Sequence, residues 1–214
     1  MRKVHANVAI AGLALVAALG LTGCPQILTE TAKKAFEDRS TGDQVTDTKI
    51  GAGILSGFSD KDKNLLFDVN ADVWEQRVML TGTLDDPKKK EDVVQLIQAD
   101  RRVRKVYDEI QVVTKEEQAR RREAAKNKDD SKKEGGAGQA VNDFWIETKI
   151  SAQLISTSGV TSVNYRWRSV RNVVYLIGRA RSQDELNTVL GIIRNTEGVK
   201  QVKHFVEIKP VAKS

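Results

Sequence analysis

The apolar positions of this chain follow two periods, which appear in the same order in its two halves. Apolar residues recur at helical spacing over roughly residues 45–57 and 143–156, which predicts an amphipathic helix at the start of each half. A segment of alternating apolar and polar residues follows each helix, and alternation indicates a β-strand with one buried face. These alternating segments span residues 67–73 and 163–167. A second strand then ends at a glycine, Gly82 in the first half and Gly178 in the second.

Each half closes with a second helix and a third strand. Helical spacing returns near residues 93–97 and 186–193, and strand-like segments follow at residues 106–113 and 202–208. We therefore predict an α+β fold of two tandem αββαβ sandwiches, each with one small sheet and two helices on one face.

The repeated order of elements reflects a repeat in the sequence itself. Residues 48–52 match residues 148–152 at an offset of 100, whereas residues 78–82 match residues 174–178 at an offset of 96. We expect two copies of one supersecondary unit, with a four-residue deletion after the first helix of the second copy.

The N-terminus has the pattern of an export signal. Arg2 and Lys3 precede an apolar run at residues 8–20 that is too short for a comfortable bilayer span. The run leads into Leu-Thr-Gly-Cys at residues 21–24, which resembles a bacterial lipobox.

The lipobox resemblance implies a lipoprotein signal peptide at residues 1–23 and a lipid-modified Cys24. Acyl chains contribute about 0.8 kcal/mol per buried CH₂, so several chains would hold the protein to a membrane persistently. Pro25 follows the cysteine, which by analogy with lipoprotein sorting favours the outer membrane. An ordinary signal peptide with an incidental cysteine, or an uncleaved anchor, stays open as an alternative.

Several short motifs resemble one bacterial envelope module, the BON domain. They are residues 78–82 with 103–106, and residues 174–178 with 198–202. Residues 39–47, 106–110 and 142–146 further resemble two-BON outer-membrane lipoproteins. That resemblance implies binding to anionic phospholipid and a role in outer-membrane integrity, with lipid anchoring on the periplasmic face of the outer membrane.

The resemblance and the repeat together predict the organisation of the chain. After the signal peptide we expect a tether at 24–42, BON domain 1 at 43–113, a charged flexible linker at 114–141, BON domain 2 at 142–208 and a tail at 209–214. Residues 116–121 could form a short exposed helix within the linker. A coil of about 25 residues spans roughly 28 Å, so we expect the linker to let the two domains separate.

Formal charge differs between the two copies. The whole chain carries +6, but residues 43–113 contain 11 basic and 14 acidic side chains, and residues 142–208 contain 9 basic and 6 acidic ones. The copies therefore carry −3 and +3. Arg166 and Arg168 alternate with aromatic residues in the second copy and are candidate headgroup contacts, although a solvated strand edge explains them equally well.

The first helix of the second copy has more apolar residues than one buried face requires. Asp143 can cap its start, and Ile146, Ile150 and Leu154 form the stripe that faces the core. Phe144, Trp145 and Ile155 lie on other sides, which predicts a second contact surface. From the resemblance, we expect phospholipid binding by Phe144, Trp145, Lys149, Ser151, Ala152, Gln153 and Ile155.

Two functions fit this second apolar surface. In the first, the helix enters the interface of an anionic phospholipid membrane, where Trp side chains are favoured. In the second, the protein is a periplasmic adaptor whose apolar helix face contacts the other domain or an outer-membrane assembly or division protein.

The sequence offers little for catalysis. Beyond the signal it retains His204 and Cys24 as its histidine and cysteine, so we expect no catalytic residues, no metal site and no cofactor. Export makes nucleic acid an unexpected partner despite the basic balance.

Overall fold

The computed structural model describes residues 36–126 and 139–210, and the structural statements below concern these residues. The predicted signal peptide at 1–23, Cys24, residues 25–35 of the predicted tether and the tail from residue 211 lie outside this range.

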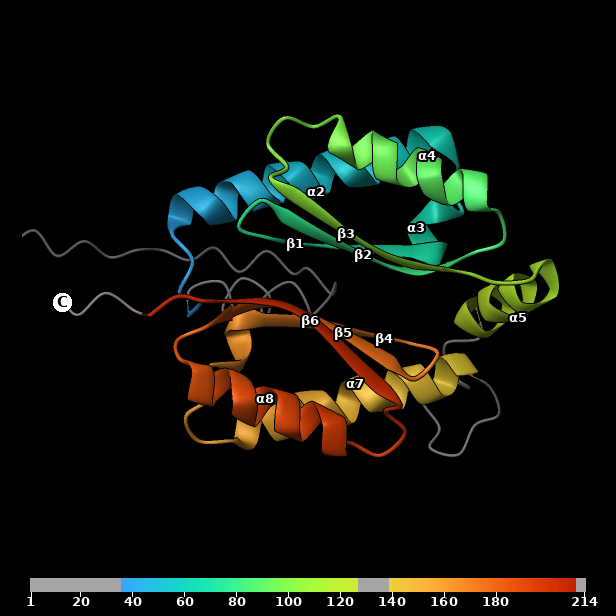
Figure 1. Ribbon diagram of the computed structural model, residues 1–214. Coiled ribbons are helices and arrows are strands. Elements are labelled where there is room, and N and C mark those ends of the chain that lie inside the picture. The colour runs from blue at the N-terminus through green and yellow to red at the C-terminus, as the bar shows by residue number, and fades with distance from the viewer. Residues whose placement is uncertain (1–35, 127–138, 211–214) are drawn as a thin grey trace, which may run out of the picture.

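Two modules of the same architecture make up the fold (Figure 1). Module 1 consists of α2 (Thr41–Lys61), α3 (Leu65–Asp68), β1 (Val69–Trp74), β2 (Arg77–Leu84), α4 (Pro87–Gln98) and β3 (Lys105–Val112). Module 2 consists of α7 (Gln139–Ser156), η1 (Ser162–Asn164), β4 (Tyr165–Val170), β5 (Val173–Ala180), α8 (Gln183–Asn195) and β6 (Gln201–Ile208). A further helix, α5 (Lys115–Lys126), follows module 1. The predicted α+β fold with two αββαβ units is confirmed.

Each module has a three-stranded sheet whose central strand is the second one. β1 and β2 pair antiparallel and β2 and β3 pair parallel, and module 2 repeats this arrangement with β4, β5 and β6. The two long helices of each module cover one face of its sheet (Figure 1). The buried apolar residues of α2 are Ile50, Ile54 and Phe58, and those of α7 are Ile146, Ile150 and Leu154.

The two modules share a single repeat register, so the predicted four-residue deletion is wrong. Asp47 on α2 accepts the backbone N–H groups of both turn residues of the β1–β2 hairpin, each at 2.7 Å. Asp143 on α7 does the same for the β4–β5 hairpin at 2.8 and 2.9 Å. The turn residues are Glu75 and Gln76 in module 1, and Arg171 and Asn172 in module 2. The offset is therefore 96 in the helices as well as in the strands.

These two aspartates explain the unusual turns that they hold. All four turn residues have positive φ angles of 48° to 65° although none is glycine, as type I′ hairpin turns require. A buried carboxylate that accepts both turn N–H groups stabilises this conformation. Asp143 is thus an internal residue of α7, which begins at Gln139, and not the predicted N-terminal cap.

The repeated glycines lie inside strands and not at their ends. β2 continues past Gly82 to Leu84, and β5 continues past Gly178 to Ala180. Gly82 has a φ of 122°, and a Cβ atom there would lie 2.1 Å from the carbonyl oxygen of Asp68. Gly178 is restricted in the same way, because its Cβ atom would lie 2.2 Å from the carbonyl oxygen of Asn164.

The two sheets pack against each other through the faces that the helices leave open (Figure 1). All eight residues of β2 are buried, because Val78 and Leu80 face the helices whereas Met79 faces module 2. The apolar centre of the contact consists of Trp74, Met79, Val170, Tyr175 and Ile177. At its edge, Tyr107 stacks on Phe205 with ring centroids 4.0 Å apart. The expectation that the modules separate is therefore wrong for this structure.

Ion pairs surround this apolar contact. Arg168 donates two hydrogen bonds to Asp72 at 2.8 and 2.9 Å, and Lys203 donates one to Glu109 at 2.7 Å. Glu75 additionally pairs with Arg179 and Lys209. Most of these pairs join an acidic side chain of module 1 to a basic side chain of module 2. The opposite formal charges of the two copies are thus matched across their interface.

The contacts follow an approximate twofold axis between the modules. Asp72 and Arg168, which bind each other, are separated by the 96-residue offset and hold equivalent positions. By the same offset, Tyr107 corresponds to Lys203 and Glu109 corresponds to Phe205. The twofold axis therefore relates the contact between Tyr107 and Phe205 to the ion pair between Lys203 and Glu109. The modules therefore associate as two subunits of a symmetric dimer do.

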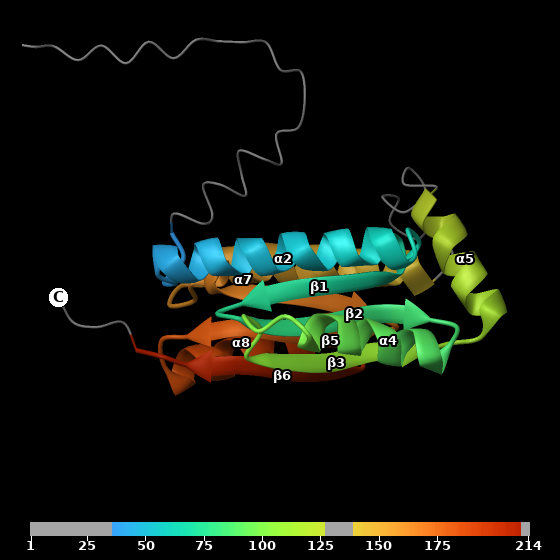
Figure 2. The same ribbon diagram turned by 90° about the horizontal axis from the view of Figure 1, so that it is seen from above.

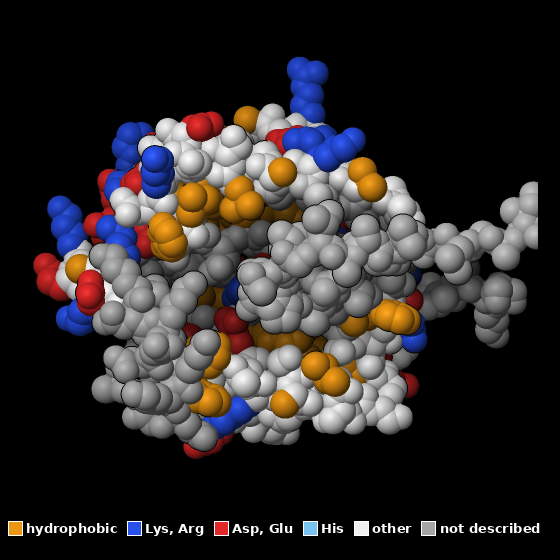
Figure 3. Space-filling view, turned by 180° about the vertical axis from the view of Figure 1, so that it is seen from behind, with side chains coloured by type: hydrophobic (Ala, Val, Ile, Leu, Met, Phe, Trp, Pro, Cys, Tyr) orange, Lys and Arg blue, Asp and Glu red, His pale blue; other side chains and the backbone are white. Residues whose placement is uncertain are grey.

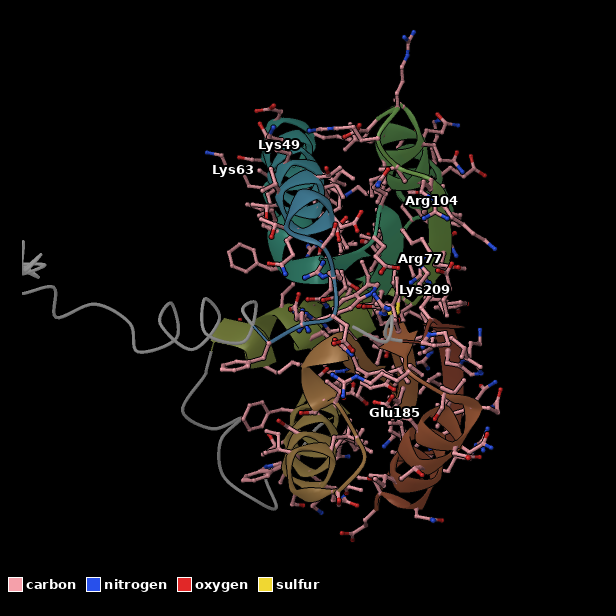
Figure 4. All side chains as sticks on the ribbon, turned by 90° about the vertical axis from the view of Figure 1, so that its left-hand side faces the viewer. Lys49, Lys63, Arg77, Arg104, Glu185 and Lys209 are labelled. Atoms are coloured by element: carbon pink, nitrogen blue, oxygen red, sulfur yellow. The ribbon has the colours of Figure 1, made fainter. Side chains whose placement is uncertain are left out.

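Arg77 crosses from module 1 into module 2. Its side chain is buried and donates to the carbonyl oxygens of Phe205 at 2.7 Å and Gly178 at 3.0 Å. The Oε1 atom of Glu207 lies 3.4 Å from the Nε atom of Arg77, and this carboxylate compensates the charge of the buried guanidinium group. Figure 4 shows Arg77 and Lys209 at the level where the two modules meet.

Segments outside the two repeats also join the modules. α5 contacts both, since Arg122 donates to Asp68 of α3 at 2.5 to 3.1 Å and Glu117 pairs with Arg171 at 3.1 Å. The short helix predicted at residues 116–121 is therefore confirmed and extends over residues 115–126. The prediction of a flexible linker at 114–141 is wrong for that helix and for residues 139–141, which belong to α7, while residues 127–138 lie outside the described range.

Replacement of the strand glycines tests the close backbone approach. We expect Gly82→Ala and Gly178→Ala each to lower the free energy of unfolding by at least about 2 kcal/mol, because the added Cβ atom meets a carbonyl oxygen. Urea unfolding of the chain from residue 25 measures the effect. Gly51→Ala is the control, because open space surrounds that helical position, and it should stabilise by about 0.5–1 kcal/mol. Equal effects at all three glycines would contradict this assignment.

Charge exchange at the twofold axis tests the interface. We expect Asp72→Arg to lower the free energy of unfolding by about 2 kcal/mol, because it places a second cation against Arg168. The double variant D72R/R168D should recover most of that loss in a double-mutant cycle. Asp92→Lys, which disrupts an ion pair within module 1, should leave the unfolding curve unchanged. A double variant no more stable than the single one would rule out a direct pair.

Candidate functional site

The outward surface of α7 exposes apolar side chains. Ile155 is 67% exposed and Phe144 is 39% exposed, and Ala152 is also exposed. Trp145 is half-buried and packs edge-on against Phe144, with ring centroids 5.6 Å apart. These four residues of the predicted lipid site thus lie on the side of the helix that points away from its core.

The remaining predicted residues of α7 lie on its flanks. Lys149 donates to Glu197 at 2.7 Å, and Gln153 donates to Thr196 at 3.2 Å, both near the end of α8. The hydrogen bond from Lys149 lowers the pKa of Glu197, so this exposed carboxylate stays charged at neutral pH. Ser151 is half-buried on the opposite flank, where it lines a groove. The structure therefore distributes the seven predicted residues over three sides of one helix.

The two candidate headgroup arginines bind acidic groups of the protein itself. Arg166 pairs with Glu37 and lies over the ring of Trp74, with its guanidinium carbon 5.3 Å from the ring centroid. Arg168 forms the bidentate pair with Asp72. The two arginines thus hold the modules together, a role that sequence reasoning did not assign to them.

A groove runs between the modules beside α7. It consists of a hollow of about 690 Å³ next to η1 and β4 and a second of about 270 Å³ next to α5. Phe144, Glu147 and Arg168 line both. Figure 3 shows this side of the molecule, with hydrophobic, acidic and basic side chains in the recess between the two modules.

Glu147 forms part of the floor of this groove. Its carboxylate accepts the backbone N–H of Ser169 at 2.7 Å, which attaches α7 to the edge of β4. Burial raises the pKa of Glu147 above the usual range of a glutamate.

Phe67, Gln118 and Arg122 are among the residues that line the smaller hollow and that sequence reasoning missed. The predicted strand at residues 67–73 includes Phe67, but this residue lies in α3 and is 77% exposed. Gln118 and Arg122 belong to α5, within the predicted flexible linker. The i, i+4 charge pattern predicted a short helix at residues 116–121 but gave no sign that this helix packs against the modules.

The segment just before α2 fixes where the chain enters the fold. Glu37 pairs with Arg166, and Asp38 exchanges two hydrogen bonds with Asn164 of η1 at 2.7 and 2.9 Å. Arg166 lines the same hollow as Ile155. The chain that comes from the predicted lipid anchor therefore joins the described fold near the C-terminal end of α7.

Two features are absent from residues 36–126 and 139–210. No helix in these ranges is both long enough and apolar enough to cross a bilayer. The same residues hold no group of three or more His, Cys, Asp or Glu side chains placed to bind a metal ion.

Comparison with known proteins agrees with the repeated architecture. The family model of the BON domain matches residues 45–114 and residues 142–210. A protein of Anaplasma centrale, described as the uncharacterized protein in the gshII 5′ region, is 36% identical over 137 residues, which cover 64% of this chain and 79% of the relative.

Two further relatives have more informative descriptions. The outer membrane lipoprotein DolP of Haemophilus influenzae is 24% identical over 173 residues, covering 80% of this chain and 79% of the relative. The 21 kDa hemolysin of Actinobacillus pleuropneumoniae is 25% identical over 171 residues, covering 79% of this chain and 77% of the relative. The two family matches together span more than half of the chain, and the protein therefore belongs to the BON domain family.

Proposed function

We propose that this chain is a lipid-anchored protein of the bacterial cell envelope that binds anionic phospholipid through the outward face of α7. The observation that carries the proposal is the exposure of Phe144 and Ile155 on a helix that already buries a separate apolar face in the core of module 2. Similarity to an outer membrane lipoprotein supports the envelope location, with Cys24 as the attachment point on the periplasmic face of the outer membrane.

The energetics favour shallow insertion of this face into the membrane interface. Burial of a Phe or Ile side chain contributes about 1.5–3 kcal/mol, and Trp145 is of the type that prefers the interface. Each nearby cation adds roughly 1 kcal/mol against an anionic leaflet, and Lys149 on the flank of α7 is one such cation. These contributions suit reversible binding by the helix.

The predicted anchor makes such weak binding sufficient. Eleven residues separate Cys24 from Phe36, and a chain of that length reaches at most about 40 Å. Because the chain joins the fold near the C-terminal end of α7, an anchored protein can bring that helix to the same membrane. Attachment then acts as a high effective concentration of lipid.

Substitution of the most exposed apolar residue tests the lipid-binding face. We expect Ile155→Glu to weaken co-sedimentation of residues 25–214 with phosphatidylglycerol vesicles by about tenfold or more, because it removes apolar burial and adds like-charge repulsion. A chain from residue 25 keeps every described contact. Ile208→Glu is the matched control, since Ile208 is 43% exposed and lies on β6, on the opposite side from α7 (Figure 2). Equal loss by both variants, or by neither, would reject the proposed face.

Removal of the acidic partner of Lys149 should have the opposite effect. We expect Glu197→Gln to strengthen binding to phosphatidylglycerol vesicles by about fivefold, because one negative charge leaves the flank of the membrane-facing helix. The gain should disappear with uncharged phosphatidylcholine vesicles and diminish at high salt. Unchanged or weaker binding of this variant would mean that the flank with Lys149 does not approach the lipid.

The alternative of a protein adaptor has its own structural support in the groove between the modules. Photo-crosslinking from position 155 in intact cells distinguishes the two functions at α7. Capture of phospholipid supports the proposal, whereas capture of protein alone would mean that this face of α7 binds a protein partner and would reject lipid binding.

A further inference from the structure

Gln118 poses a question that neither the fold nor lipid binding answers. Its side chain is 1% exposed, and its Oε1 atom has no hydrogen-bond partner among the described residues. An unpaired acceptor in such a place destabilises the fold, so its presence calls for a physical reason. Gln118 lines the hollow of about 270 Å³ between α5, α7 and the edge strands β1 and β4.

We propose that this hollow binds an extended, uncharged peptide segment of a partner protein, with one aromatic side chain seated between Phe67 and Phe144. Gln118 accepts a main-chain N–H of the peptide. The proposal does not depend on lipid binding by α7.

The hollow also offers a donor for a peptide carbonyl oxygen. Arg121 lies beside Gln118 on α5, and its contacts with Glu117 and Asp143 are both 3.5 Å, at the outer limit of a hydrogen bond. Arg122, in contrast, is held by Asp68, to which it donates from both Nε and Nη2. One buried acceptor beside one loosely held donor is the pair of groups that a peptide main chain satisfies.

Two phenyl rings from different modules border the site. Phe67 on α3 is 77% exposed and Phe144 on α7 is 39% exposed, and both line the hollow. Exposed aromatic rings at the two sides of a polar hollow favour an aromatic guest, which packs against ring faces and edges. The neighbouring larger hollow shares Phe144 and leaves room for the residues on either side of that guest.

The charges of the lining balance each other. The hollow is bordered by the carboxyl groups of Asp68, Asp143 and Glu147 and by the guanidinium groups of Arg121, Arg122 and Arg168. Arg122 is held by Asp68 and Arg168 by Asp72. A lipid phosphodiester brings acceptors and no donor, so it would leave the Oε1 atom of Gln118 unpaired. An uncharged peptide supplies the missing N–H donor and adds no net charge.

Chemical-shift titration of residues 25–214 tests the site directly. The probes are capped peptides of sequence acetyl-Thr-Thr-X-Thr-Thr-amide, with X as Phe, Tyr or Trp, and with Ala as the reference. We expect backbone amide shifts at Asn70, Thr83 and Ser169, which line the hollow, and at least fivefold tighter binding of an aromatic peptide than of the Ala peptide. Equal affinities, or shifts confined to other surfaces, would overturn the proposal.

Gln118→Leu separates a binding role from a structural one. It should weaken the aromatic peptide at least fivefold while leaving the midpoint of thermal unfolding unchanged or raised, because it removes an unpaired buried acceptor. Thr81→Val is the matched control, since Thr81 also has a buried side-chain oxygen without a partner in the described structure but lies outside the hollow. Unchanged peptide affinity in Gln118→Leu would refute the site.

Phe67→Ser provides a second test that does not touch the core. This exposed residue can change without loss of folding, and we expect peptide affinity to fall at least threefold while binding to phosphatidylglycerol vesicles stays the same. If vesicles shift the amides that line the hollow and the peptides do not, the groove is a lipid site and the peptide proposal fails.

Discussion

Each three-stranded sheet of this protein has two faces, and its two helices cover only one of them. The central strands β2 and β5 therefore place every second residue, including Met79 and Tyr175, on a face that would meet water if the module stood alone. The other module covers that face, and Arg77 reaches across to bind backbone carbonyl groups on the far side. Because each module buries the open sheet of the other, the positions of α5 and of the entering chain, which contact both modules, depend on this pairing.

The pairing decides which side chains remain for outside partners. Module 2 supplies most of the cations at the interface, so arginines that resemble a headgroup site in the sequence are already bound to carboxylates such as Asp72. What module 2 still presents is the apolar outward face of α7, with Lys149 on its flank. In the proposed function, attraction to an anionic membrane would therefore depend on insertion of apolar groups and on attachment of the chain, and less on the net charge of the module.

Periodicity predicted the elements of both modules because each helix and strand buries a face toward its own core. The docking of the modules had a weaker signal in the sequence, namely the opposite charges of the two copies. Alternation of apolar and polar residues along a strand does not distinguish a solvated face from one that another module covers. The match of residues 48–52 to residues 148–152 gave an offset of 100, which is four residues, or about one helical turn, larger than the true one. The equivalent contacts of Asp47 and Asp143 show that the offset is 96. Phe67 and Gln118 could not be placed, because a groove between modules depends on the docking itself.

The approximate twofold axis raises the question of why a module pairs with its neighbour and not with its own kind. At the axis, two copies of module 1 would place Asp72 against Asp72, and two copies of module 2 would place Arg168 against Arg168. Like charges at one contact disfavour both homotypic pairings, whereas the mixed pair forms a bidentate ion pair. Only twelve residues separate α5 from α7, so the two halves of one chain meet at high effective concentration. Charge thus selects the mixed pairing, and the short connection favours its formation within a single chain.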